Sequence, residues 1–318
     1  MLKIKNNGKT DVVVKKISRI FFALLLHCSL ANAQSTSLEL LTQKAEKGDT
    51  VAMMSLAKIY FEGQGVTRNE IEARKWIEKA AEKGVVKAML NLAGIYNQGV
   101  GIDRNDIKAK EWTEKAAQKG NAEAMYNLGM IHFLGQGTVQ SGPMAESWFQ
   151  KSADKDHTAA MVMLGYIYAE GQGVPKDYQK AKTWYGKAAR HGDIEGMYNL
   201  GELYYYGYGG PQNYSKAREW YLKSASLGNA EAMRQIGGLY YLGRGVAKDY
   251  AKAKEWFKRA MERGNTEAMI NLAVMYYEGE GMPIDESKAK LLLEKACSLG
   301  SPKACDHLKV LKECENKK

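Results

Sequence analysis

Residues 229–264 read NAEAMRQIGGLYYLGRGVAKDYAKAKEWFKRAMERG, a segment whose pattern indicates its secondary structure. Its first third places apolar residues at helical spacing. The pair Gly243-x-Gly245 then interrupts the helix, because glycine readily adopts left-handed backbone angles. Asp249 has a side-chain oxygen that can accept from the free N–H groups at the start of a second helix, and Gly264 ends that helix. The stretch therefore predicts two helices joined by a turn.

The same pattern recurs along the chain every 36 residues. The Gly-x-Gly pairs and all six tryptophans keep this interval without insertion or deletion. So does a column of methionines, where a column is one position of the repeat compared between repeats. One helix pair cannot bury its own apolar face, so successive pairs must stack on one another. The sequence therefore predicts an all-α superhelix, a solenoid of seven helix-turn-helix repeats: 49–84, 85–120, 121–156, 157–192, 193–228, 229–264 and 265–300.

Two columns are expected to control packing. Small residues lie midway along the first helix of each repeat, where they allow the partner helix to approach closely: Ala57, Ala93, Gly129, Gly165, Gly201, Gly237 and Ala273. The second helix carries the tryptophan, whose large ring is expected to fill the gap to neighbouring repeats: Trp76, Trp112, Trp148, Trp184, Trp220 and Trp256.

The N-terminal segment 1–33 has the pattern of an export signal. Three bases precede an apolar run of about eleven residues, which is too short for the ~20 residues that span a bilayer. The Ala31-Asn32-Ala33 sequence then predicts cleavage before Gln34. We expect an exported bacterial protein, periplasmic or secreted, with no stable membrane span after cleavage. An uncleaved anchor is the alternative.

The two ends of the repeat array carry lone helices. Segment 34–48 is expected to be an N-terminal capping helix, and 301–318 a C-terminal capping helix with a polar tail. The formal charge of the chain is +10, but half of it lies in 1–33. Since the rest of the chain is only weakly basic, we expect no nucleic-acid partner.

The pattern NAEAMYNLG at 121–129, followed by Gly-x-Gly and by Lys-Ala-Lys-x-Trp-Tyr/Phe, resembles the Sel-1-like repeat family, which is related to tetratricopeptide repeats. The resemblance covers about residues 38–309. It implies a right-handed α/α superhelix that binds other proteins on its concave face, in envelope signalling or host interaction. The third repeat departs from the pattern at 141–144 and at 155–156. This indicates either a repeat that has merely diverged in sequence, or a local kink or contact site.

By similarity to the tetratricopeptide arrangement, the first helices line the concave groove. Side chains on this face vary between repeats, whereas the core columns do not, and such variation is typical of a recognition surface. Tyrosine is frequent there and offers both contact area and a hydroxyl. The alternative is that the rings cover seams between repeats. The expected partner-binding residues are Tyr126, Phe133, Tyr166, Tyr198, Tyr205, Tyr206, Tyr241, Tyr277 and Arg234.

The cysteines predict one disulfide. Cys297 and Cys305 lie on either side of the turn between two helices, at columns whose side chains should touch, and a disulfide fits an oxidising compartment. The spacing also resembles that of secreted cysteine-rich Sel-1-like proteins. Cys28 is expected to be removed with the export signal, and Cys314 to be either free or bridged to another molecule.

Some cysteine-rich relatives have been described as binding or hydrolysing β-lactams, so a β-lactamase-type hydrolase is the alternative function. Ser-x-x-Lys occurs at Ser55, Ser152 and Ser287, at different positions of the repeat and without companion motifs. A carbohydrate or peptidoglycan reader is a third possibility, because tyrosine faces also stack on sugars. We favour a monomeric scaffold for a protein or peptide ligand, without catalytic residues, metal ion or cofactor.

Overall fold

The computed structural model describes residues 37–315, with side chains as far as residue 311. The expected export segment 1–33 lies outside the described residues, and so does the side chain of Cys314. The described residues form helices and turns, with no strand among them.

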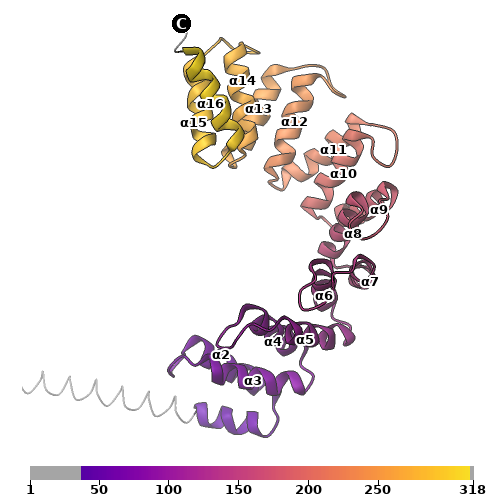
Figure 1. The fold of residues 1–318 in the computed structure, drawn as a ribbon, viewed down its shortest axis with the longest axis vertical. Helices are drawn as coiled ribbons and strands as arrows, with labels where there is room; N and C mark the ends of the chain where they lie inside the picture. Colours follow the sequence, from indigo (N-terminus) through magenta and orange to yellow (C-terminus); the bar gives the residue numbers. More distant parts are fainter. Residues whose placement is uncertain (1–36, 316–318) are drawn as a thin grey trace, which may run out of the picture. The chain divides into compact units, whose positions relative to one another are not determined.

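Helices alternate in pairs along the chain, and each repeat contributes a first and a second helix (Figure 1). This confirms the predicted α-solenoid of seven repeats. Residues 37–46 are also helical, and α16 (Pro302–Glu315) follows the last repeat. The first helices are α2 (Thr50–Glu62), α4 (Val86–Gln98), α6 (Ala122–Leu134), α8 (Thr158–Glu170), α10 (Ile194–Tyr206), α12 (Ala230–Leu242) and α14 (Thr266–Glu278). The second helices are α3 (Glu70–Glu82), α5 (Asp106–Gln118), α7 (Gly142–Ala153), α9 (Tyr178–Arg190), α11 (Tyr214–Ser226), α13 (Tyr250–Glu262) and α15 (Glu286–Ser298).

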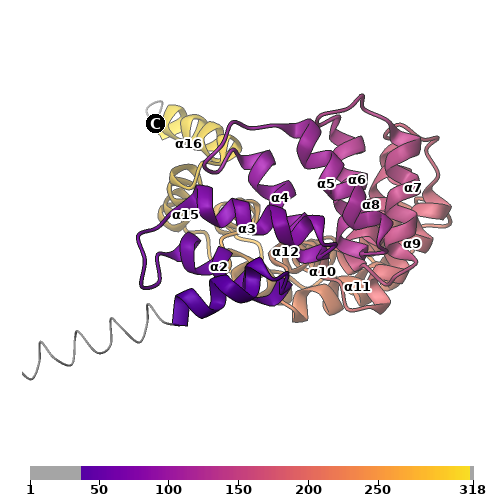
Figure 2. The same ribbon diagram turned by 90° about the horizontal axis from the view of Figure 1, so that it is seen from below.

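The chain divides into two compact units within the third repeat. The first unit extends to Ile131 and includes Gly135–Val139, and the second contains His132–Leu134 and the chain from Gln140 onward. In the first unit α2 to α5, and in the second unit α7 to α16, consecutive helices pack against one another in chain order (Figures 1 and 2).

The predicted helix caps are present in every repeat. In the sixth repeat, the Asp249 side chain accepts a hydrogen bond from the backbone N–H of Lys252, at 3.0 Å. The Gly-x-Gly pair of that repeat has two separate functions. Gly243 ends α12 with a φ of +69°. Gly245 lies against the preceding repeat, where an added Cβ would be 2.6 Å from the Cβ of Tyr214. The second glycine is therefore also required by contact between repeats.

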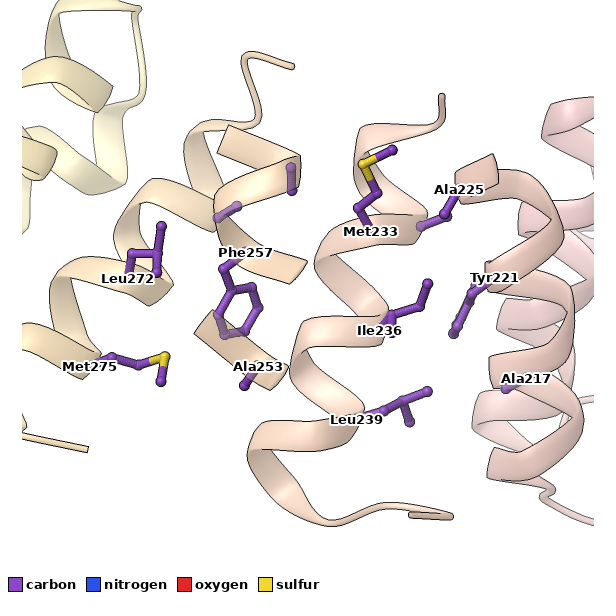
Figure 3. Close-up of a cluster of buried hydrophobic side chains, with 13 residues drawn as sticks. Ala217, Tyr221, Ala225, Met233, Ile236, Leu239, Ala253, Phe257, Leu272 and Met275 are labelled. Carbon is purple, nitrogen blue, oxygen red and sulfur yellow. The ribbon is translucent and has the colours of Figure 1, made fainter. Parts of the chain in front are cut away.

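In repeats three to six, the residue after the tryptophan is an aromatic ring buried in the core. Phe149, Tyr221 and Phe257 are almost completely buried. Figure 3 shows the ring of Phe257 between α12 and α14, close to Leu272 and Met275 of α14. The small residue of the first helix faces this ring, because a Cβ added to Gly237 would lie 2.6 Å from Cδ1 of Phe257.

The tryptophans, expected to fill the gap between repeats, differ in burial, and Trp256 packs against the cluster that contains Phe257. Only Trp76 and Trp184 are buried, at 7% and 8% exposure, and the other four are half-buried. In each case a cation three residues later covers the ring face: for example, Lys115 Nζ lies 3.8 Å from the ring centroid of Trp112. Successive helix residues point about 100° apart, so only one of two neighbouring rings can face the first helix. The smaller ring occupies that position.

The third repeat closes differently from the others. At the end of each other repeat a glycine has a positive φ, whereas here Asp156 has a φ of 60°, the one such non-glycine among the described residues. Its carboxylate lies 3.4 Å from Nε2 of His191 in the next repeat. At the start of α7, Gly142 lies directly on the backbone of Gly173, where a Cβ on Gly173 would be 2.6 Å from Cα of Gly142.

The predicted disulfide is present at the C-terminal end. Cys297 of α15 is bonded to Cys305 of α16, with their Cα atoms 4.8 Å apart. The bond connects the last repeat to the helix that follows it.

Candidate partner-binding surface

All nine residues expected to contact a partner lie on first helices, from α6 to α14. Their exposure differs. Tyr166, Tyr206 and Tyr277 are exposed. The remaining six are half-buried: Tyr126, Phe133, Tyr198, Tyr205, Tyr241 and Arg234. The ring of Phe133 contacts that of Tyr166 edge to face, with the centroids 6.2 Å apart.

A polar network holds the centre of this surface in the second unit. The Glu202 carboxylate accepts hydrogen bonds from the Tyr221 hydroxyl and, at 2.9 Å, from Nε2 of Gln235. Burial raises the pKa of Glu202 above its ordinary value. The ring of Tyr198 lies 5.9 Å from that of Tyr221. Because Gln235 belongs to the sixth repeat and the other residues to the fifth, the network joins these two repeats.

Arg234 belongs to a second, connected set of contacts. Its Nε donates to the Glu231 carboxylate at 2.8 Å, and Nδ2 of Asn265 donates to the same carboxylate at 2.8 Å. Burial would raise the pKa of Glu231, but the hydrogen bonds from Arg234 and Asn265 lower it overall. Arg234 is thus held in place by side chains from two repeats.

Two of the expected residues take part in seams between repeats. Tyr205 contacts Tyr214 edge to face at 5.2 Å, and its hydroxyl accepts a hydrogen bond from the Arg244 guanidinium of the next repeat. Tyr241 contacts Tyr250 at 5.5 Å, and the Tyr250 hydroxyl donates to Glu280 of the next repeat at 2.6 Å. Tyr205 and Tyr241 therefore lie at seams between repeats.

The first unit has a hollow that sequence reasoning did not single out. It has a volume of about 250 Å³ and lies among the helices α4, α5 and α6. Leu90, Gly94 and Met130 form part of its wall, together with the amide side chains of Asn97 and Asn127. A Cβ on Gly94 would meet nothing within 4 Å, so no packing contact requires glycine there. The sequence signal that was available is a glycine in the interior of a predicted helix, where glycine is unfavourable.

Sequence reasoning also missed the first residue of the second helices. That position is acidic in the first two repeats, Glu70 and Asp106, but tyrosine in repeats four to six: Tyr178, Tyr214 and Tyr250. Each of these tyrosines lies beside the middle residue of the next Gly-x-Gly pair: Tyr208, Arg244 and Glu280. The change from acid to tyrosine within one column was the available signal.

The three Ser-x-x-Lys serines lie on three different helices, α2, α7 and α15. The Ser55 hydroxyl donates to the carbonyl of Val51 in its own helix at 2.8 Å, and Ser152 is fully buried. Within residues 37–311, no group of three or more His, Cys, Asp or Glu side chains is placed to hold a metal ion. None of the described helices combines the length and the apolar character that a membrane span needs.

Comparison with known proteins places the repeats in a family. The Sel1 repeat profile matches seven consecutive segments: 50–85, 86–121, 122–157, 158–193, 194–229, 230–265 and 266–301. A search of curated proteins gave no significant match.

Two solved structures resemble the chain along most of its length. A Sel1 repeat protein from Oxalobacter formigenes is 30% identical with a TM-score of 0.77, and the match covers 88% of this chain and 81% of that protein. The c5321 protein, a protective antigen of uropathogenic Escherichia coli strains with an SLR fold, is 31% identical with a TM-score of 0.75. That match covers 86% of this chain but only 59% of c5321. Yeast Tom70, 19% identical with a TM-score of 0.50, shares the fold alone. The chain belongs to the Sel1 repeat family.

Proposed function

We propose that this protein is an exported scaffold that binds a protein or peptide along the first-helix face of its repeats. We define that face in the second unit, by Tyr166, Tyr198 and Arg234. The main support is the network around Glu202 and Glu231, in which Arg234 donates to Glu231 and the ring of Tyr198 lies against that of Tyr221. Preorganised side chains lose less conformational entropy on binding.

The variation along the face also supports a recognition role. Position 94 is glycine, and the equivalent position in later repeats is Met130, Tyr166 and Glu202. The core column facing the second helix holds only small residues throughout. A scaffold that served packing alone would not require such differences on one face.

The test is a selection of peptides from a random display library on the purified chain, followed by calorimetric titration of the selected peptides. We expect the double variant Tyr166→Ala with Tyr198→Ala to bind at least about tenfold more weakly, since aromatic anchors contribute over ~1 kcal/mol each. A matched control replaces two exposed side chains of second helices, Ile107→Ala with Leu222→Ala. Equal binding by both variants would contradict the proposed surface.

We further propose export to an oxidising compartment. The Cys297–Cys305 disulfide supports this, because disulfides persist outside the reducing cytosol. Expression of the full chain in a bacterium, followed by fractionation and thiol alkylation, tests it. The periplasmic or medium fraction should contain a shortened chain in which these two cysteines resist alkylation until a reductant is added. Recovery of only full-length, fully alkylated protein from the cytosol would contradict export.

A further inference from the structure

We propose that a second surface, formed where the loops of repeats four to six meet, binds an acidic segment of a partner protein. We call it the tyrosine edge and define it by five residues: Tyr178, Tyr205, Tyr206, Tyr208 and Tyr214. It includes the loop end of the first helix α10 but shares no residue with the face defined above by Tyr166, Tyr198 and Arg234, so either surface can fail its test without the other.

The tyrosine edge is one continuous set of ring contacts. Tyr178 and Tyr208 stack with centroids 4.6 Å apart and planes 9° apart, and Tyr206 stacks on Tyr208 at 5.4 Å. Tyr205 meets Tyr206 edge to face at 4.9 Å and also contacts Tyr214. Despite these contacts, Tyr206 and Tyr208 remain 50% and 43% exposed.

Cations surround the tyrosine edge. The Arg244 guanidinium lies 5.6 Å from the ring centroids of both Tyr205 and Tyr214. Lys176 Nζ is 5.3 Å from the centroid of Tyr178 and 3.4 Å from its hydroxyl oxygen. Lys216 extends over the adjoining ring of Tyr204, at 5.5 Å. None of these three cations forms an ion pair with a carboxylate of the described residues.

In the first two repeats the cation at the position of Lys176 is paired with an acid. The equivalents of Lys176 in the first two repeats, Arg68 and Arg104, pair with Glu70 and Asp106. Tyrosine replaces that acid at Tyr178.

The equivalents of Lys216 show the same difference. Lys252 and Lys288 pair with the N-cap carboxylates Asp249 and Asp285, at 3.1 and 2.8 Å. In the fifth repeat the N-cap is the neutral Asn213. At the tyrosine edge, Lys176 and Lys216 therefore lack the acids that pair with these equivalents, as Lys108 and Lys248 do elsewhere in the described repeats.

The carboxylates near the tyrosine edge already accept hydrogen bonds from other groups. Glu202, which influences Tyr206 electrostatically, accepts from Tyr221 and Gln235. Asp177 caps α9 by accepting from two backbone N–H groups. The positive charges of Lys176, Lys216 and Arg244, which no described ion pair offsets, thus favour a ligand that has carboxylates.

The ring geometry favours an acidic peptide over a sugar or a nucleic acid. Sugars and bases bind tyrosine through the ring face, but the stack covers both faces of Tyr208 and one face each of Tyr178 and Tyr206. Tyrosine hydroxyls can in addition donate hydrogen bonds to carboxylates. Together with Arg244 and Lys176, these donors suit the Asp and Glu side chains of an extended segment.

The test uses a fluorescein-labelled peptide of six Glu-Gly units, titrated by anisotropy at low salt because such contacts are screened at high ionic strength. The site variant is Lys176→Gln with Arg244→Gln. The matched control, Lys115→Gln with Lys151→Gln, removes two cations that also lie on rings and form no described ion pair. We expect at least about a tenfold loss of affinity in the site variant and less than about twofold in the control. Equal losses in both, or no loss in the site variant, would overturn the proposal.

A second variant keeps the rings and removes only hydroxyls. Tyr206→Phe with Tyr208→Phe should weaken peptide binding several-fold with unchanged helical circular dichroism. If the cation variant fails to fold, this second variant tests the proposed surface in its place. Unchanged affinity in this variant would overturn the role of the hydroxyls. A DNA strand and an oligogalacturonate, each chosen to carry the same net charge as the peptide, should bind more weakly than the peptide. Tighter binding of either, lost in the same cation variant, would overturn the assignment to a protein partner.

Discussion

Adjacent glycines of α12 should respond in opposite directions to the same substitution. A Cβ on Gly237 would lie 2.6 Å from Cδ1 of Phe257, whose ring is almost completely buried between α12 and α14 (Figure 3). A Cβ on Gly238 would meet nothing within 4 Å. Gly237→Ala should therefore destabilise the protein, and Gly238→Ala should stabilise it.

The magnitudes follow from two opposing contributions. Replacing glycine by alanine inside a helix stabilises it by about 0.5–1 kcal/mol, and this gain applies at both positions. At Gly237 the extra methyl group forces a shift of a packed ring, and such overpacking costs about 1–3 kcal/mol. We expect net destabilisation of about 1–2 kcal/mol at Gly237 and stabilisation of about 0.5–1 kcal/mol at Gly238. Because the chemical change is the same, effects on the unfolded chain largely cancel between the two.

The assay is thermal unfolding followed by circular dichroism, together with amide hydrogen exchange of α12 and α13. A repeat array can unfold in parts, and exchange reports the repeat that carries the substitution. The Tm values of the two variants should differ by about 4–8 °C for a domain of this size. A shift of both variants in the same direction, or destabilisation by Gly238→Ala, would refute the assignment of Gly237 as the close-packed position.

Three further perturbations test other contacts. Asp156→Gly should stabilise by about 0.5–1 kcal/mol, because glycine tolerates the positive φ and the exposed pair with His191 contributes little; denaturant unfolding would measure it. Reduction of Cys297–Cys305, or Cys305→Ser, should cost about 2–3 kcal/mol for so short a loop and should increase exchange in α16 first. Burial raises the pKa of Glu202, so the folded state binds its proton more tightly and stability falls as pH rises above the ordinary value of 4.5. Glu202→Gln should flatten this fall in a series of unfolding curves, and an unchanged pH profile would contradict the assignment.

Much of the architecture could be predicted from the chain alone. The interval of 36 residues, the N-cap column that includes Asp249 and the glycine at each first-helix end are local signals, and the structure has each of them. The Cys297–Cys305 bond was predictable for a related reason, since a repeat shows which columns touch across each turn. In these cases neighbours in sequence are also neighbours in space.

The identity of the core ring needed the coordinates. Trp256 and Phe257 are adjacent and both apolar, and their order says nothing about which of them faces Gly237. That choice depends on how two helices are rotated about their axes when they pack, which changes by about 100° from one residue to the next.

The contacts of Tyr205 depended on tertiary structure for the same kind of reason. Its position predicts an inward-facing ring, yet it lies against Tyr214 and Arg244. Arg244 is 39 residues away along the chain and reaches Tyr205 only because the loop of the next repeat packs on the start of α11. Periodicity in sequence specifies which elements form and in what order, whereas the partner of each side chain depends on the angle and offset at which those elements meet.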